Sequence, residues 1–188
     1  VRSGCVRGRI LSIQFKPGVP WDEFTIVTAK DVPPPNRIAL IVDDQPCLAD
    51  EIINHAEEPV VLLAHPDRHL AERARTLVAI DVEPLPSVHS IDDALKADTV
   101  VWGRDNIFKS YAVNRGDVDR GMAAAHRIIE GEYETGAQEQ LYIEPQGMIA
   151  LADPDDGLTI WGSLQCPYYV HKALAALFSL PRDKIRVV

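Results

Sequence analysis

The sequence predicts a folded α+β protein, and three observations indicate this class. Alternating or β-branched runs typical of strands recur between residues 7 and 82. A helical apolar period starts directly after one of these runs, at Pro66, and is followed by another strand-like run. The composition is typical of one large globular domain or two small ones, because 46% of the 188 residues are hydrophobic and 25% are charged.

Strands are expected first in the N-terminal part of the chain. Residues 7–15 alternate between the two sides of an extended chain, which predicts a first strand. The apolar, β-branched runs at residues 24–28 and 38–42 predict two more. Residues 33–36, three prolines and an asparagine, separate these two runs because a regular element does not easily cross them.

Residues 59–82 predict a strand, a helix and a second strand. A helix is expected over residues 67–78, with Pro66 in its first turn, because apolar residues recur there at helical spacing. We expect this helix to pack against strands at residues 60–63 and 78–82.

The middle of the chain predicts a linker between short elements. One helical turn is expected at residues 91–95, whereas residues 97–117 have little periodicity and contain turn-forming glycine and asparagine. Asp117 is expected to cap a short helix that runs to Ala125. Residues 128–135 alternate glutamate with apolar or small side chains, which predicts a half-buried strand with an acidic face.

The C-terminal part predicts a hairpin, a helix and a strand. Residues 148–152 and 158–162 flank a turn rich in aspartate, proline and glycine. The turn lacks the glycine and glutamate spacing of an EF-hand, so we interpret it as a solvated loop. Pro167 opens a helix that Pro181 closes, and residues 184–188 begin another strand.

Charge and hydropathy exclude two classes of partner. Lys and Arg total 19 against 28 Asp and Glu, giving a net charge of -9 without a basic cluster, so no nucleic-acid partner is expected. Uninterrupted apolar runs such as residues 59–64 are far shorter than the ~20 residues that cross a bilayer, so no membrane partner is expected. Residues 1–5 carry neither an initiator Met nor a leader, which predicts a cytoplasmic chain that begins inside a longer reading frame.

Motifs that bind metals or supply nucleophiles are also absent. Cys5, Cys47 and Cys166 lie too far apart in the sequence for a disulfide framework, a thiolate zinc site or an iron–sulfur cluster. His65 and His69 have the spacing of two metal ligands on one helical face, but no third ligand lies nearby in the sequence. We therefore expect no metal to be bound directly by side chains of this chain. Serine hydrolase, P-loop and dinucleotide-binding motifs do not occur.

Gln165 is the candidate functional residue. It lies between the strand expected at residues 158–162 and the helix opened by Pro167, in a tight connection from which a polar side chain can point away from the packed layer. Its amide can donate and accept hydrogen bonds at once. The pattern alone still favours a helix-capping or internally hydrogen-bonded glutamine over a functional one.

Two passages near Gln165 resemble the large subunit of the molybdenum hydroxylases, the xanthine dehydrogenase and aldehyde oxidase family. In that family, a G-x-Q-E/D-H-x-Y-L/I-E segment is followed by a strand that ends in S-x-Q and leads to a helix. The counterparts here are Gly136, Gln138, Glu139, Tyr142, Ile143, Glu144, Ser163 and Gln165. Earlier runs, at residues 27–32, 44–50, 58–60 and 82–86, are similar to the family's α/β-hammerhead domain. The chain departs from the family pattern at Gln140, where the family has histidine, and at Glu57, where it has glycine.

The resemblance implies a domain order and a cofactor. Residues 1–105 correspond to the hammerhead domain, residues 106–116 to a linker, and residues 117–188 to the start of a truncated molybdopterin-binding catalytic domain. The cofactor is molybdenum–molybdopterin, bound mainly by segments beyond this chain. Iron–sulfur clusters and FAD are expected on partner subunits or domains of an oligomeric complex.

The resemblance also implies an activity and a role for Gln165. The family hydroxylates a small-molecule aldehyde, purine or N-heterocycle with oxygen derived from water, and this chain is expected to be one part of its catalytic subunit. Gln165 matches the family glutamine whose amide hydrogen-bonds to an oxygen ligand of the molybdenum, which makes it the expected catalytic and cofactor-binding residue. Cys166 is expected to have only a packing role.

Two alternatives stay open. The chain is equally compatible with a non-catalytic scaffold or assembly module of such a complex. A free-standing metal hydrolase that uses His65 and His69 is the third interpretation, and it requires a third ligand.

Overall fold

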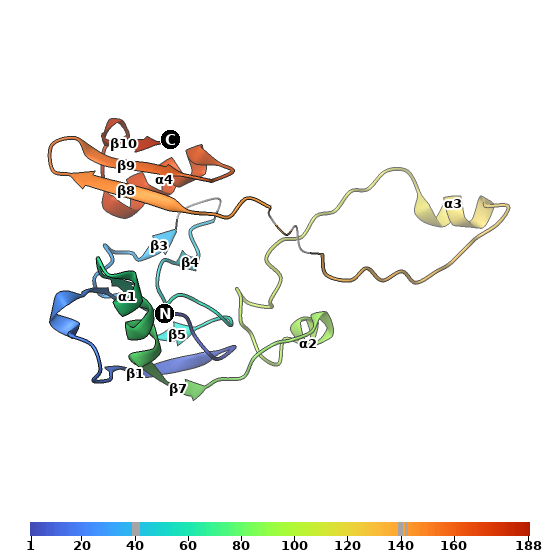
Figure 1. Ribbon diagram of the computed structural model, residues 1–188. Helices are drawn as coiled ribbons and strands as arrows, with labels where there is room; N and C mark the ends of the chain where they lie inside the picture. Colours follow the sequence, from blue (N-terminus) through green and yellow to red (C-terminus); the bar gives the residue numbers. More distant parts are fainter. Residues whose placement is uncertain (39–41, 139–140, 142) are drawn as a thin grey trace.

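The computed structural model describes residues 1–38, 42–138, 141 and 143–188. Its helices and strands form two groups, residues 1–96 and residues 148–188. Residues 97–147 lie between them and are called the arm below; the described part of the arm, residues 97–138, 141 and 143–147, is largely extended and loops out (Figure 1).

An antiparallel sheet organises the first group, with strand order β5-β1-β7. Two strand pairs accompany it, β2 with β6 and β3 with β4. The strands are β1 (Gly8–Phe15), β2 (Thr25–Val27), β3 (Arg37–Ile38), β4 (Gln45–Pro46), β5 (Ile52–Ile53), β6 (Leu62–Ala64) and β7 (Val78–Pro84), and a 3-10 turn spans Trp21–Glu23. The strands predicted at residues 7–15 and 24–28 are confirmed, whereas the strand predicted at 38–42 is found only at Ile38, and residues 39–41 lie outside the described residues.

Helix α1 (Arg68–Leu77) confirms the helix expected from the apolar period, and it contacts both β6 and β7. Asp67 caps its N-terminus by accepting hydrogen bonds from the backbone N–H groups of His69 and Leu70. Pro66 therefore precedes the cap instead of standing in the first turn, because the carboxylate of Asp67 satisfies the free helical N–H groups better than proline can. The strand predicted at residues 60–63 begins later, as β6.

The core of the first group is a cluster of fully buried aliphatic side chains. Ile53, Val60, Val61 and Ala49 form its centre, with partly buried residues of β1, β6 and β7 packed around them. Val1 helps to hold this centre in place, since its carbonyl accepts from the Val60 and Val61 N–H groups at 3.0 and 3.2 Å.

A second three-stranded sheet organises the C-terminal group, with strand order β10-β9-β8. Its elements are β8 (Met148–Asp153), β9 (Gly157–Gly162), helix α4 (Pro167–Phe178), a 3-10 turn (Arg182–Lys184) and β10 (Ile185–Val187). The predicted hairpin, helix and final strand are thus confirmed, and β10 runs parallel to β9. Gly157 is required at the hairpin turn, because its φ is +89° and a Cβ there would collide with the Lys184 carbonyl.

The arm follows α2 (Ile91–Lys96) and carries α3 (Val118–Ala124), capped by Asp117 as expected. The strand predicted at residues 128–135 is wrong for this structure, because no strand within the described residues pairs with that segment. Across the described parts of the chain, no helix is long and apolar enough to span a membrane.

The fold class is α+β, as the sequence predicts.

Candidate functional site

The site is built on the four-residue connection between β9 and α4. Both of its ends are tied down: the Ser163 N–H donates to the Gly147 carbonyl at 3.2 Å, and the Cys166 carbonyl accepts from the first turn of α4. Leu164 is half-buried, whereas Gln165 is exposed. The connection therefore turns one apolar side chain inward and presents the amide of Gln165 outward, as the sequence predicts.

A close backbone approach fixes where this connection starts. A Cβ at Gly162 would meet the Gly147 carbonyl oxygen and the Met148 side chain, each at 2.8 Å. Only glycine leaves room for the chain just before β8 to lie against the end of β9. The segment that leads into β8 and the Gln165 connection are consequently held side by side.

This contact brings together the two passages that the sequence singles out. Gln165 and Ser163 line a hollow of about 730 Å³ together with Leu141, Ile143, Glu144 and Gln146. Motif residues Glu139, Gln140 and Tyr142 lie outside the described residues. Gly136 and Gln138 are described, are exposed, and do not line this hollow.

The hollow offers mostly neutral hydrogen-bonding groups. Among the described residues that line it, two amides, from Gln165 and Gln146, and the hydroxyl of Ser163 stand beside one carboxylate, that of Glu144. Among the described residues, the Gln165 amide has no hydrogen-bond partner, so its donor and acceptor are both available to a ligand. Gln146 falls just after the matched motif, which is why sequence comparison with the family pattern did not find it.

His65, one of the two histidines considered as metal ligands, has other contacts. The ring of His65 packs on Phe24 with centroids 4.6 Å apart, its Nδ1 accepts from the Asp67 N–H at 2.9 Å, and its Nε2 lies 3.6 Å from a Glu23 carboxylate oxygen. Across the described residues, no three His, Cys, Asp or Glu side chains are grouped as metal ligands. The hydrolase interpretation thus gains no third ligand for His65 and His69 from this part of the chain.

Cys166 is exposed at the N-cap of α4. The packing role expected for it is therefore wrong, because the connection directs this side chain to the surface. Cys47 is half-buried, and burial raises the pKa of its thiol.

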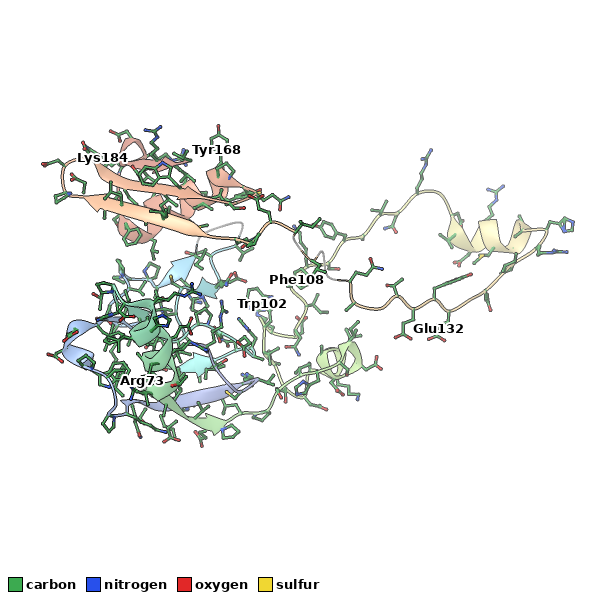
Figure 2. All side chains as sticks on the ribbon, in the orientation of Figure 1. Arg73, Trp102, Phe108, Glu132, Tyr168 and Lys184 are labelled. Carbon is green, nitrogen blue, oxygen red and sulfur yellow. The ribbon has the colours of Figure 1, made fainter. Side chains whose placement is uncertain are left out.

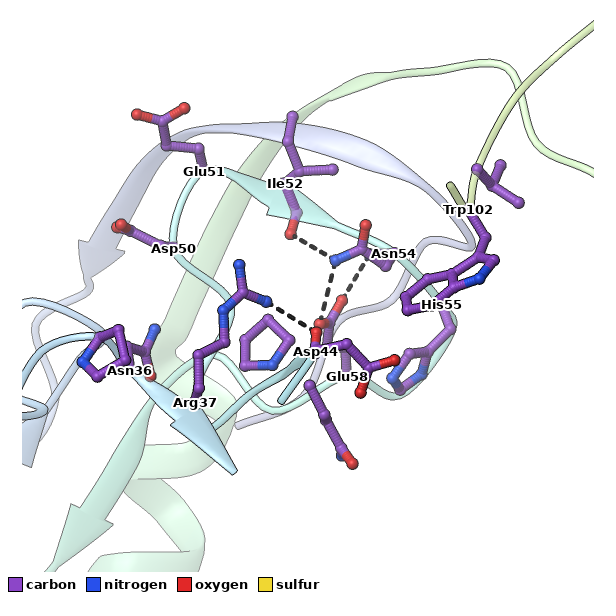
Figure 3. Close-up of a pocket in the computed structure, with 14 residues that line it drawn as sticks. Asn36, Arg37, Asp44, Asp50, Glu51, Ile52, Asn54, His55, Glu58 and Trp102 are labelled. Atoms are coloured by element: carbon purple, nitrogen blue, oxygen red, sulfur yellow. Dashed lines mark hydrogen bonds between the residues drawn. The ribbon is translucent and has the colours of Figure 1, made fainter. Parts of the chain in front are cut away.

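A second hollow, of about 820 Å³, lies in the first group between the β3–β4 pair, β5 and the arm (Figure 3). Two of its charged side chains are engaged within the chain: the buried Glu58 carboxylate accepts from the backbone and side chain of Asn54, and Arg37 donates to the Asp44 carbonyl at 2.7 Å. Because these contacts hold loops together, whereas the Gln165 amide has no partner among the described residues, we take the hollow beside Gln165 as the candidate functional site.

Comparison with known proteins agrees with this location. Residues 102–188 match the profile of the molybdopterin cofactor-binding domain. Over 164 residues, which are 87% of this chain, the sequence is 30% identical to a protein of Bacillus subtilis (strain 168) named as a probable xanthine dehydrogenase subunit. It is 26% identical over 189 residues to the nicotinate dehydrogenase large molybdopterin subunit of Eubacterium barkeri, across 100% of this chain. The chain is related to the molybdenum hydroxylases.

The chain spans only part of its molybdenum hydroxylase relatives. It covers 22% of the Bacillus protein and 44% of the Eubacterium protein. Two solved structures have the same fold over 100% of the chain: a Cu,Mo-CO dehydrogenase and the aldehyde oxidoreductase of Desulfovibrio gigas. Each matches with a TM-score of 0.82 and 24% sequence identity. The match covers 26% and 22% of those chains, respectively.

Proposed function

We propose that this chain is part of the catalytic subunit of a molybdenum-dependent dehydrogenase or oxidase that hydroxylates an aldehyde, purine or N-heterocycle with oxygen derived from water. The observation that carries the proposal is the amide of Gln165, which has no partner among the described residues and faces a hollow shared with the first matched passage. The relatives named as xanthine dehydrogenases and aldehyde oxidases support this reaction class.

The groups in the hollow suit one edge of a molybdenum–molybdopterin cofactor. That group supplies two-electron chemistry and oxygen transfer when it is bound. Its polar edge carries acceptor atoms, for which the N–H groups of Gln165 and Gln146 and the hydroxyl of Ser163 are suitable donors. A carboxylate at position 165 would instead repel such acceptors, so a neutral amide fits the task.

In this mechanism Gln165 binds and orients. Its connection is pinned to Gly147 at one end and to the start of α4 at the other, so the amide is presented with little freedom of the backbone beneath it. A donor fixed in this way stabilises negative charge that builds up on its acceptor during the reaction.

The finer architecture follows from the same proposal. Residues 1–105 form an α/β-hammerhead domain, residues 106–116 a linker, and residues 117–188 the start of the molybdopterin-binding catalytic domain. Iron–sulfur clusters and FAD belong to partner subunits or domains of a cytoplasmic oligomer, and the substrate is a small molecule.

The exposed apolar residues of the arm favour a second candidate, a non-catalytic assembly module of the same complex. The two candidates make different predictions for Gln165, whose amide matters for turnover only in the catalytic case.

The test is Gln165→Ala in the assembled enzyme, with single-turnover reduction of the molybdenum centre by substrate as the measurement. Loss of one hydrogen bond to a charged or strongly polarised acceptor costs about 1.5–3 kcal/mol, which predicts a rate lower by about ten to two hundred fold. Molybdenum and pterin content should stay unchanged. The matched control is Gln14→Ala, an exposed glutamine on β1 that bonds only to Ser12 and should leave the rate unaltered. Unchanged kinetics in Gln165→Ala with full metal content would refute the catalytic role and favour the assembly module.

A further inference from the structure

Residues 128–134, the part of the arm that returns from α3, have two chemically different sides. Ile129 and Tyr133 are 81% and 89% exposed. Tyr133 lies on the same side as Gly131, because a Cβ at Gly131 would meet the Tyr133 hydroxyl at 2.9 Å. The alternate positions are Ile128 and then Glu130, Glu132 and Glu134, so this side is acidic from residue 130 onward, and Figure 2 shows Glu132 well away from both groups.

The backbone of this segment is unpaired. Within the described residues, no backbone N–H or carbonyl of residues 128–134 makes a hydrogen bond to another part of the chain. A segment with free backbone groups, an apolar side and a charged side has every property of a strand except a neighbour.

The size of the related proteins indicates what supplies that neighbour. The solved structures match this chain over its whole length, arm included, yet the match covers only 22–26% of the chains in the two cited above. Most of their polypeptide therefore lies outside the matched segment. A second copy of this chain is a poor occupant, because the net charge is -9 and paired copies would set the three glutamates against each other.

We propose that residues 128–134 add as a strand to a sheet edge in the remaining part of the catalytic subunit. That edge has an apolar face that covers Ile129 and Tyr133, and lysine or arginine side chains that face Glu130, Glu132 and Glu134. The inference goes beyond the proposed function, since it concerns assembly and holds whether or not Gln165 takes part in turnover.

The experiment is hydrogen exchange, followed by mass spectrometry, of peptides covering residues 128–134. In the assembled catalytic subunit these amides should exchange at least about tenfold more slowly than in the isolated 188-residue chain. Exchange at the rate of an unstructured chain in the assembled subunit would overturn the proposal. Protection that develops in the isolated chain as its concentration rises would also overturn it, because the neighbour would then be a second copy.

A pair of charge reversals tests the acidic side. Glu132→Lys should remove most of the protection, or prevent assembly, because it places a cation against the expected lysines or arginines. Asp98→Lys makes the same change of charge at an exposed position at the base of the arm and should leave both protection and assembly intact. Equal behaviour of the two variants would contradict the proposed basic face.

Discussion

The first group and the arm put their apolar side chains in opposite surroundings. Ile53, Val60 and Val61 are 0% exposed in the first group, whereas Phe108 is 83% and Ile143 is 100% exposed in the arm. Both regions are rich in apolar residues, so composition does not explain the difference. The first group buries an apolar core against itself, whereas the exposed apolar side chains of the arm are typical of a segment that another polypeptide covers.

The largest expected effect separates the two regions by a matched pair of substitutions. Ile53→Ala removes buried methyl and methylene groups from the core centre and should lower the free energy of unfolding of the 188-residue chain by about 2–5 kcal/mol. Ile143→Ala deletes the same atoms from a fully exposed position and should change it by less than about 0.5 kcal/mol. Urea unfolding measures both, and similar losses would show that the arm packs on the chain itself.

A smaller effect is expected at Asn106, where the base of the arm is fastened to the first group. Its side-chain N–H groups donate to the Ala94 and Thr99 carbonyls at 3.0 and 2.9 Å, and its Oδ1 accepts from the Val101 N–H at 2.7 Å. Its φ of +65° also suits asparagine better than alanine. Asn106→Ala should cost about 1–3 kcal/mol and increase exchange of residues 99–106 while the core amides stay protected. If the core amides also exchanged faster, the hydrogen bonds of Asn106 would contribute to the stability of the core and not only to that of the arm's base.

The smallest expected effect is on the stability of α1 at acidic pH. Hydrogen bonds from the backbone N–H groups of Leu70 and His69 hold the pKa of Asp67 below its ordinary value. The cap therefore stabilises α1 fully above that ordinary value, and its contribution is lost as pH falls through the lower pKa of the folded state. Asp67→Asn keeps an N-cap acceptor and should remove this part of the acid dependence, measured by circular dichroism between about pH 2 and 5. An unaltered acid profile would show that Asp67 does not contribute to it.

The sequence predicted elements whose signals are local. The apolar period after Pro66 located α1, and the aspartate, proline and glycine between residues 152 and 158 located the β8–β9 hairpin. It did not reveal β5, because a two-residue strand is defined by its pairing with β1 and not by any pattern of its own. It also predicted a strand at residues 128–135, since alternation shows which sides a chain has but not whether a neighbour is present.

The candidate site also has a part that the sequence predicted and a part that it did not. The position of Gln165 followed from a strand end, a proline and the family pattern, and the structure places its side chain on the surface as expected. That Gln146 shares the hollow was not predictable, because the two passages are held together by Gly162 and Gly147 across the sheet.

Limited trypsin digestion tests most directly the claim that the first group is self-sufficient and the arm awaits a partner. In the isolated 188-residue chain, we expect trypsin to cut first in the arm, after Arg115, Arg120 and Arg127. Cleavage in the first group, after Arg9, Arg73 and Arg75, should be at least about tenfold slower. The same arm sites should become resistant in the assembled catalytic subunit. Cleavage of the first group as fast as the arm, or an arm equally sensitive after assembly, would contradict the account.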